Sequence, residues 1–319
     1  MKQSDLGIPA WGWITFCIVV VVLLVIDHLA HRGERAASRK VALVWSIIWI
    51  AAGLGFDVYI WFELGTQAAS QYLATYVIEK ALSTDNMFLF LIVFKTLNIP
   101  LKEQHKSLFW GIAGAVVFRG VLIFLGAAAL QRWEWITYIF GLIILYAAYR
   151  AFRQDPAKEQ ENRLIQALSK RLPITDKTQG GKFIARENGR LTATPLFLAL
   201  VAIELVDIMM AVDSVAVAFS MSRNDFVIYT SNVFAILGLR ALYLLLANTI
   251  GRMRYLHYGL AIVLAFAGLK LIADPLIDVP PLVSVAFTVV IIGASVWLSL
   301  RSGNARHEKT RLVVGEKQR

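Results

Sequence analysis

Nine long apolar runs constrain this chain more than any other feature of its sequence. Each is long enough to cross a bilayer as an α-helix, which needs about 20 predominantly apolar residues. Only helices or a closed barrel satisfy every backbone hydrogen bond within lipid, and runs of this length exclude barrel strands. The runs lie at about 11–30, 41–63, 72–96, 107–130, 134–151, 193–220, 226–250, 256–273 and 281–300. The sequence therefore predicts an all-α, polytopic membrane bundle of about nine transmembrane helices.

The composition excludes several classes of function. Hydrophobic residues make up 58% and charged residues 17% of the chain, against about 45–50% and about 25% in soluble domains. The net charge of +10 resides in short connections between apolar runs, so we expect no nucleic-acid partner. A single cysteine, Cys17, excludes an intramolecular disulfide. No GxxxxGK[ST] motif is present, which excludes ATP hydrolysis within this chain. The acids within the apolar runs could be catalytic in a membrane-embedded hydrolase, but no nucleophile constellation accompanies them, so we expect no enzymatic activity.

The distribution of lysine and arginine indicates the orientation of the chain. Basic residues are concentrated in alternate connections, at 31–40, 95–106, 152–192, 252–254 and 301–319. The positive-inside rule then places the N-terminus outside and the C-terminus in the cytoplasm. Basic residues rather than a cleavage site follow the first run, so we interpret it as a retained anchor in the plasma (inner) membrane.

Two of the runs carry the same acidic motif. Both fit an acid, five residues, Asp, then Asn or Ser: Glu79–Asp85–Asn86 in "EKALSTDN" and Asp207–Asp213–Ser214 in "DIMMAVDS". One run later, each half has an arginine within apolar sequence, Arg119 and Arg240. Because the charge count gives the two motif-bearing helices opposite directions, we expect two inverted three-helix repeats, as in many transporters.

This reading divides the chain into five parts. They are residues 1–71 with the first two helices, 72–151 with the first repeat, 152–192 as a cytoplasmic basic loop, 193–273 with the second, inverted repeat, and 274–319 with the last helix and a cytoplasmic tail. The loop's stretch "EQENRLIQALSKRL" is compatible with a helix on the membrane surface or with a basic linker. The lipid bilayer is one partner, and the sequence leaves a homo-oligomer open.

Acids within the apolar runs point to the function. A charge at the bilayer centre costs roughly 2.5–3.5 kcal/mol, so these acids should face the bundle interior. On a regular helix Glu79, Ser83 and Asn86 share a face, whereas the second acid of each motif is rotated about 120° from the first. Local unwinding near 83–86 and 211–214 would bring both acids of a motif into one cavity. Unbroken helices would direct them at different neighbours.

Carboxylate, amide and hydroxyl oxygens are the ligands that Mn²⁺, Ca²⁺ and Mg²⁺ prefer. No His or Cys accompanies the motifs, which argues against zinc or copper. We predict a cation site formed by Glu79, Asp85, Asn86, Glu204, Asp207, Asp213 and Ser214, with supporting positions at Ser83, Arg119, Arg240, Asp57 and Asn232. Alternatively, the arginines pair with the acids and only fix helix register. We favour a mixed case, in which they neutralise part of the acids.

The stretches "YVIEKALSTDNMFLF", "LFWGIAGAVVFRG", "ELVDIMMAVDSVAVAFS" and "VIYTSNVFAILGLRALY" resemble the TerC family of integral membrane proteins, in particular its Alx-like branch. The resemblance covers about residues 72–273. It implies a nine-helix bundle related to cation exporters, a link to manganese homeostasis through efflux, and an association with tellurite resistance. It also implies roles for the seven motif positions named above. Many members have a proline after the second motif that is absent here, which puts the local helix break in doubt.

These observations predict an exporter of a divalent cation, first of all Mn²⁺, through a midplane site of carboxylates from both repeats. The cation is a transported substrate rather than a bound cofactor, and transport is coupled to protons or to the membrane potential. Tellurite is an oxyanion that a carboxylate-rich cavity would repel, so its effect should be indirect. The alternative is a membrane partner in metal-stress or tellurite resistance that supports metal loading of exported enzymes.

Overall fold

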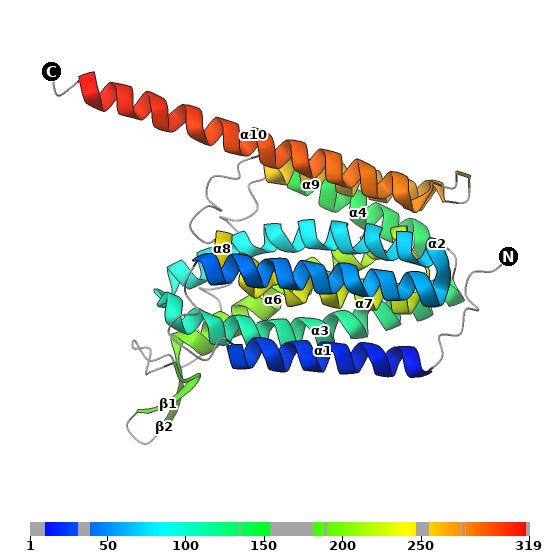
Figure 1. Cartoon of the computed structure of the whole chain (residues 1–319), viewed down its shortest axis with the longest axis horizontal. Helices are drawn as coiled ribbons and strands as arrows, with labels where there is room; N and C mark the ends of the chain where they lie inside the picture. Colours follow the sequence, from blue (N-terminus) through cyan, green and yellow to red (C-terminus); the bar gives the residue numbers. More distant parts are fainter. Residues whose placement is uncertain are drawn as a thin grey trace.

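The computed structural model of the chain describes residues 10–30, 39–133, 135–153, 181–187, 190–246, 255–274, 276–277 and 279–316. Helices dominate this part of the chain (Figure 1): α1 (Ala10–Ala30), α2 (Arg39–Thr96), α3 (Leu101–Arg132), α4 (Ile136–Arg153), α6 (Pro195–Met221), α7 (Asp225–Leu237), α8 (Leu239–Leu246), α9 (Leu256–Ala273) and α10 (Pro281–Glu316). Two strands, β1 (Ile184–Glu187) and β2 (Arg190–Ala193), form an antiparallel hairpin.

Seven helical segments of the described chain are long and apolar enough to cross a membrane. They are Lys40–Thr96, Leu101–Arg132, Ile136–Arg153, Pro195–Met221, Asp225–Leu245, Leu256–Ala273 and Pro281–Ser299. Large apolar side chains such as Phe62, Val117 and Leu142 are exposed on their outer faces, as lipid contact requires. The prediction of an all-α polytopic membrane protein is confirmed, whereas the count of about nine spans and the inverted repeats stay predictions.

Helix α2 turns back on itself at Gly65. This residue has φ 84° and ψ 176°, a conformation that glycine adopts far more readily than other residues. The Tyr72 hydroxyl donates to the Gly53 carbonyl at 3.1 Å, so the segments on either side of Gly65 pack antiparallel (Figure 1). The sequence predicted a connection over 64–71. The structure instead keeps both segments helical up to the glycine, because one residue is enough to reverse the chain.

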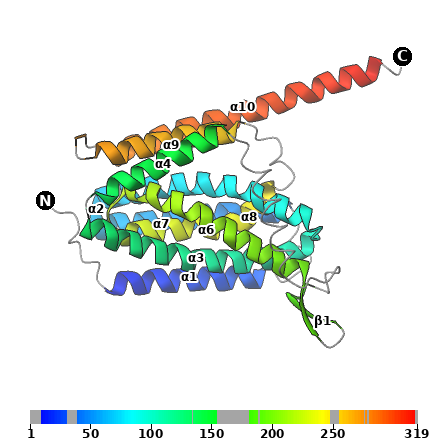
Figure 2. The same ribbon diagram turned by 180° about the vertical axis from the view of Figure 1, so that it is seen from behind.

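The helices pack as neighbours from the two halves of the chain. α2 lies against α7, α3 against α6, and α4 against α9, while α10 runs along α9 and extends beyond the bundle (Figures 1 and 2). At the α4–α9 crossing, Gly268 approaches the Gly141 backbone so closely that a Cβ on Gly268 would lie 3.1 Å from the Gly141 carbonyl oxygen. Close contact between small residues is the usual way in which membrane helices associate.

A second difference from the prediction lies in the span 226–250. Helix α7 ends at Leu237, Gly238 forms a turn with φ −81° and ψ −2°, and α8 begins at Leu239, so the helix is locally irregular there, although Asp225–Leu245 is still one apolar span. The Lys80 ammonium donates to the Ala235 carbonyl at 2.9 Å, near the C-terminal end of α7. A cation is favourable there because helix C-termini carry partial negative charge. The predicted end at 250 lies outside the described residues.

The strands β1 and β2 lie at the end of the predicted loop 152–192, a feature that the sequence analysis did not predict. Ile184 pairs with Ala193, and Asn-Gly stands between the strands in the sequence, a dipeptide that favours tight hairpins. Residues 154–180, including the predicted surface helix, lie outside the described part. The hairpin projects from the end of the bundle where α6 begins, which we call the hairpin end; the Gly65 turn lies at the opposite end (Figures 1 and 2).

Candidate functional site

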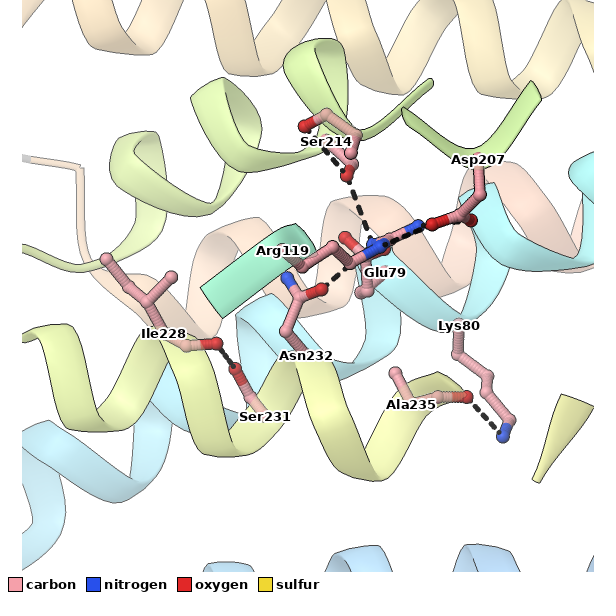
Figure 3. Close-up of polar contacts among 10 residues, drawn as sticks. Glu79, Lys80, Arg119, Asp207, Ser214, Ile228, Ser231, Asn232 and Ala235 are labelled. Atoms are coloured by element: carbon pink, nitrogen blue, oxygen red, sulfur yellow. Dashed lines mark hydrogen bonds and ion pairs between the residues drawn. The ribbon is translucent and has the colours of Figure 1, made fainter. Parts of the chain in front are cut away.

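Arg119 of α3 lies at the centre of the bundle with 1% of its surface exposed. Because its neighbours in "GAVVFRGVLIF" are apolar, the guanidinium must find its partners on other helices. It forms an ion pair with Glu79 of α2, and it donates to Asp207 of α6 at 3.2 and 3.4 Å. It also donates to Ser214 of α6 at 3.2 Å and to Asn232 of α7 at 2.8 Å (Figure 3). We call these five residues the Arg119 cluster.

The Arg119 cluster joins the two acidic motifs. Glu79 and Asp207 are the first acids of their motifs, and they are only 1% and 5% exposed. One guanidinium therefore faces two buried carboxylates, as the mixed interpretation of the sequence predicts. Asn232, which the sequence also suggested as a helix–helix contact, supplies a neutral acceptor. The cluster fixes α2, α3, α6 and α7 relative to one another.

The second acid of the α6 motif is directed elsewhere. Helix α6 is continuous from Pro195 to Met221, so of the two alternatives left open by the sequence, the unbroken helix rather than unwinding near 211–214 is observed. Asp213, six residues after Asp207, is therefore rotated by about 120°. Its carboxylate faces α4, where one oxygen lies 4.0 Å from the Arg150 guanidinium.

The unbroken alternative also holds for the first motif, near 83–86. Gly65 is the one non-helical position described within α2, and residues 83–86 are helical. Neither motif contains the glycine or proline that commonly breaks a helix, so the backbone hydrogen bonds are kept. Asp85 therefore lies on a regular part of α2, but its side chain is outside the described part of the structure.

A cavity lies between α2, α4, α6 and α9, with about 60 Å³ of space for water-sized molecules. One water needs about 10–15 Å³ of such space, so about four waters, or a partly hydrated cation, would fit. The polar groups in its wall come from Asn86, Arg150, Asp213 and Ser214. Ser214 also accepts from Arg119, so one residue forms the boundary between the cluster and the cavity.

Other predicted residues lie elsewhere in the bundle, where Ser83 and Arg240 are buried and Glu204 and Asp57 are half-buried. The Glu204 carboxylate lies against Gly114 of α3, and its Oε2 has no hydrogen-bond partner among the described residues. The Ser83 hydroxyl and the Asp57 Oδ1 atom are likewise buried without such a partner in the described part. Arg240 of α8 is buried. These residues are inside the protein, as predicted, but Ser83, Glu204 and Asp57 take no part in the hydrogen bonds of the Arg119 cluster.

The chemistry of the cavity differs from that of a tight metal centre. Among the described residues, no three His, Cys, Asp or Glu side chains gather closely enough to hold a metal ion. A cation in the cavity would meet one carboxylate from Asp213, the amide oxygen of Asn86, the hydroxyl of Ser214 and water. These are hard oxygen ligands. A partly hydrated site of this kind favours binding that is weak enough to be reversed, which transport requires.

Two residues of the cavity wall escaped the sequence analysis. Arg150 lies at the end of the predicted span 134–151, where a basic residue is typical of a membrane interface. Only the packing of α4 against α6 brings it to Asp213. Met210 of α6 also lines the cavity.

These features define a polytopic membrane protein with a buried ionic cluster and, beside it, a mainly apolar cavity whose wall includes four polar side chains. The family model described as integral membrane protein TerC family matches residues 64–307, and the chain belongs to this family. The resemblance drawn from the sequence is thereby confirmed.

Relatives cover nearly the whole chain. A membrane protein of Myxococcus xanthus, described as uncharacterised, is 36% identical over 301 residues, which is 93% of this chain and 94% of the relative. Alx of Escherichia coli K12, described as a candidate membrane-bound redox modulator, is 36% identical over 324 residues, covering 97% of this chain and 99% of Alx. No solved structure matches the chain.

Proposed function

We propose that the protein exports a hard divalent cation, with Mn²⁺ as the first candidate and Ca²⁺ or Mg²⁺ as alternatives, coupled to protons or to the membrane potential. The observation that carries this proposal is the cavity beside the Arg119 cluster. Its oxygen ligands come from both motifs, Asn86 from the first and Asp213 and Ser214 from the second. A site between two halves of a helical membrane protein is typical of secondary transporters.

The cavity is better suited to the cation than the Arg119 cluster. Within the cluster, one guanidinium already contacts both carboxylates. At an effective dielectric constant of about 20, a divalent cation about 4 Å from a unit positive charge is repelled by about 8 kcal/mol. We therefore propose that Glu79 and Asp207 hold Arg119 and the helices in place, whereas Asn86 and Asp213 bind the cation and Ser214 lies at the boundary between the cluster and the cavity.

A divalent cation needs more negative charge than Asp213 alone provides. The corresponding acid of the first motif is Asp85, which precedes Asn86 in the sequence. We propose Asp85 as the second carboxylate of the site. Glu204, with a buried carboxyl oxygen that lacks a described partner, is our candidate for a proton-carrying acid.

We further propose nine spans with two inverted repeats in the plasma membrane. The reversal at Gly65 supports this count because it makes α2 two spans. If the units 72–151 and 193–273 are repeats, α2 corresponds to α6, α3 to α7 and α4 to α9. The α2–α7 contact then has its counterpart in the α6–α3 contact, and the α4–α9 contact is its own counterpart, as an inverted repeat requires. We assign the hairpin end to the cytoplasm, because the connections richest in lysine and arginine join helices there.

Mn²⁺ flux across proteoliposome membranes tests the exporter. The native chain should carry Mn²⁺ down an imposed gradient, and Asp213→Asn and Asp85→Asn should each abolish flux while the protein still elutes as a folded species. Asp274→Asn is the matched control, since it removes a carboxylate from an exposed ion pair with Arg223. Failure of the native protein to carry Mn²⁺, Ca²⁺ or Mg²⁺ under any gradient would refute the proposal.

The second candidate is a membrane partner that supports metal loading of exported enzymes during metal stress or tellurite exposure. The description of Escherichia coli Alx as a redox modulator, rather than a transporter, favours testing it. Here the one cysteine of the chain, Cys17, is exposed on α1, so we propose that any redox effect is indirect. Deleting residues 155–190 discriminates: an exporter should keep its flux, whereas a partner acting through this loop should lose its cellular activity.

A further inference from the structure

A cationic side chain of the protein already faces the acid of the cavity. Arg150 and Asp213 are 4.0 Å apart, which is too long for a hydrogen bond. Their side chains are 29% and 24% exposed, and both line the cavity. By contrast, Arg119 is fully buried and hydrogen-bonded to its acids. Arg150 is therefore held to Asp213 by charge, with room for either side chain to move.

The position of Arg150 places this charge on one side of the cavity. Arg150 lies in the last turn of α4, the end that is directed toward the hairpin end (Figures 1 and 2). A long arginine side chain there can withdraw toward the interface and place its guanidinium in water. Arg150 can therefore leave Asp213 without any movement of the helix backbone.

We propose that Arg150 is an internal counter-cation of Asp213 that divalent cations displace and monovalent cations do not. This inference rests on the proposed function, because it assigns selectivity to the same cavity. Na⁺ or K⁺ in place of the guanidinium presents the same single positive charge to Asp213. The electrostatic attraction therefore does not increase, whereas the ion must lose part of its hydration shell. A divalent cation doubles the charge and therefore the attraction. Arg150 thereby makes the site select cations by charge.

Mn²⁺ binding to the purified full-length protein in nanodiscs tests this role, with free Mn²⁺ followed by electron paramagnetic resonance. Each sample is measured in sodium chloride and in choline chloride of equal concentration, so that ionic strength is constant. In choline, Arg150→Gln should bind Mn²⁺ at least tenfold more tightly than the native chain. Sodium should remove much of this gain, because Na⁺ can now occupy the place of the guanidinium.

Arg153→Gln is the matched control. Arg153 is in the same last turn of α4, but its guanidinium lies over the Tyr149 ring at 5.1 Å and it does not line the cavity. The native chain, Arg153→Gln and the charge-preserving Arg150→Lys should all bind Mn²⁺ equally in the two salts. In an Asp213→Asn background, Arg150→Gln should give no gain. If Arg150→Gln does not fold, Arg150→Met carries the same expectation.

The outcomes separate this inference from the proposed function. If the native chain binds Mn²⁺ and Arg150→Gln binds no more tightly, with no new sensitivity to sodium, the counter-cation role is overturned while the exporter stands. If neither protein binds Mn²⁺, and neither binds Ca²⁺ or Mg²⁺ measured in its place, both proposals are overturned. Binding that is detectable only after Arg150→Gln supports the inference, since the native guanidinium then suppresses occupation of the site.

Discussion

Substituting methionine for Arg119 should destabilise the protein by about 3–5 kcal/mol, the usual cost of removing one partner of a buried ion pair. The structure places this variant at the upper end of that range. Two carboxylates, Glu79 and Asp207, would lose their counter-charge. In addition, Asn232 and Ser214 would lose a charged donor, and each lost hydrogen bond adds about 1 kcal/mol.

The pair between Arg223 and Asp274 provides a matched control, because its N–O distance of 3.2 Å equals that between Arg119 and Asp207. The two pairs differ in burial, since the Arg223 and Asp274 side chains are 34% and 46% exposed. Exposed ion pairs contribute about 0–1 kcal/mol, so Arg223→Met should be nearly neutral. The comparison isolates the effect of burial from that of geometry.

Unfolding in mixed micelles, titrated with a denaturing detergent and followed by tryptophan fluorescence, measures both variants. A triple variant with Arg119→Met, Glu79→Gln and Asp207→Asn should recover most of the loss, because it leaves no unpaired charge in the bundle. Equal losses for Arg119→Met and Arg223→Met would refute the argument from burial. Failure of the triple variant to recover stability would show that the loss does not come from the unpaired acids.

Three further predictions use the same unfolding titration. Gly65→Ala should cost about 1–3 kcal/mol, because alanine disfavours the positive φ of the turn. Its control, Gly55→Ala, should be neutral or stabilising, because nothing lies within 4 Å of the added Cβ. Equal effects of the two substitutions would contradict a strained turn. Gly268→Ala should cost about 1–3 kcal/mol by overpacking the α4–α9 crossing, and Gly293→Ala, in open space on α10, should not. Asn224 caps α7 by accepting from Phe226 and Val227, so Asn224→Ala should cost about 0.5–2 kcal/mol, while Asn224→Asp should retain the cap and its stability.

The sequence predicts the spans because bilayer thickness sets the length of each apolar run. It fails where the path of the chain depends on a single residue. Hydropathy over 64–71 does not reveal that Gly65 alone reverses the chain at φ 84°. Similarly, a one-residue turn at Gly238 leaves the apolar character of 226–250 unchanged, although it separates α7 from α8. Both are local changes of backbone conformation, which the average hydrophobicity of a run does not reveal.

The site shows the same division between what periodicity can and cannot predict. The rotation of about 120° between Asp207 and Asp213 follows from helix geometry alone. Which neighbour each acid meets depends on how helices distant in sequence pack, and no local pattern encodes that. Arg119 was recognisable because it interrupts an apolar run, whereas Arg150 at a span end looked like any interfacial residue. Long-range packing, rather than residue type, makes Arg150 part of the cavity.

The continuity of α6 explains how one motif can serve two purposes. Asp207 lies in a buried ion pair with Arg119, and Asp213 faces a cavity that can hold water. Because the intervening helix is unbroken, Ser214 is held by Arg119 while its neighbour Asp213 stays free of the cluster. Unwinding would merge the two acids in one site and bring the Arg119 charge close to any bound cation, which would weaken binding. A continuous helix instead separates the acid that stabilises the bundle from the acid that we propose binds the cation. Substitution of Asp213 therefore tests the proposed cation site with little expected effect on folding, whereas substitution of Asp207 should destabilise the bundle.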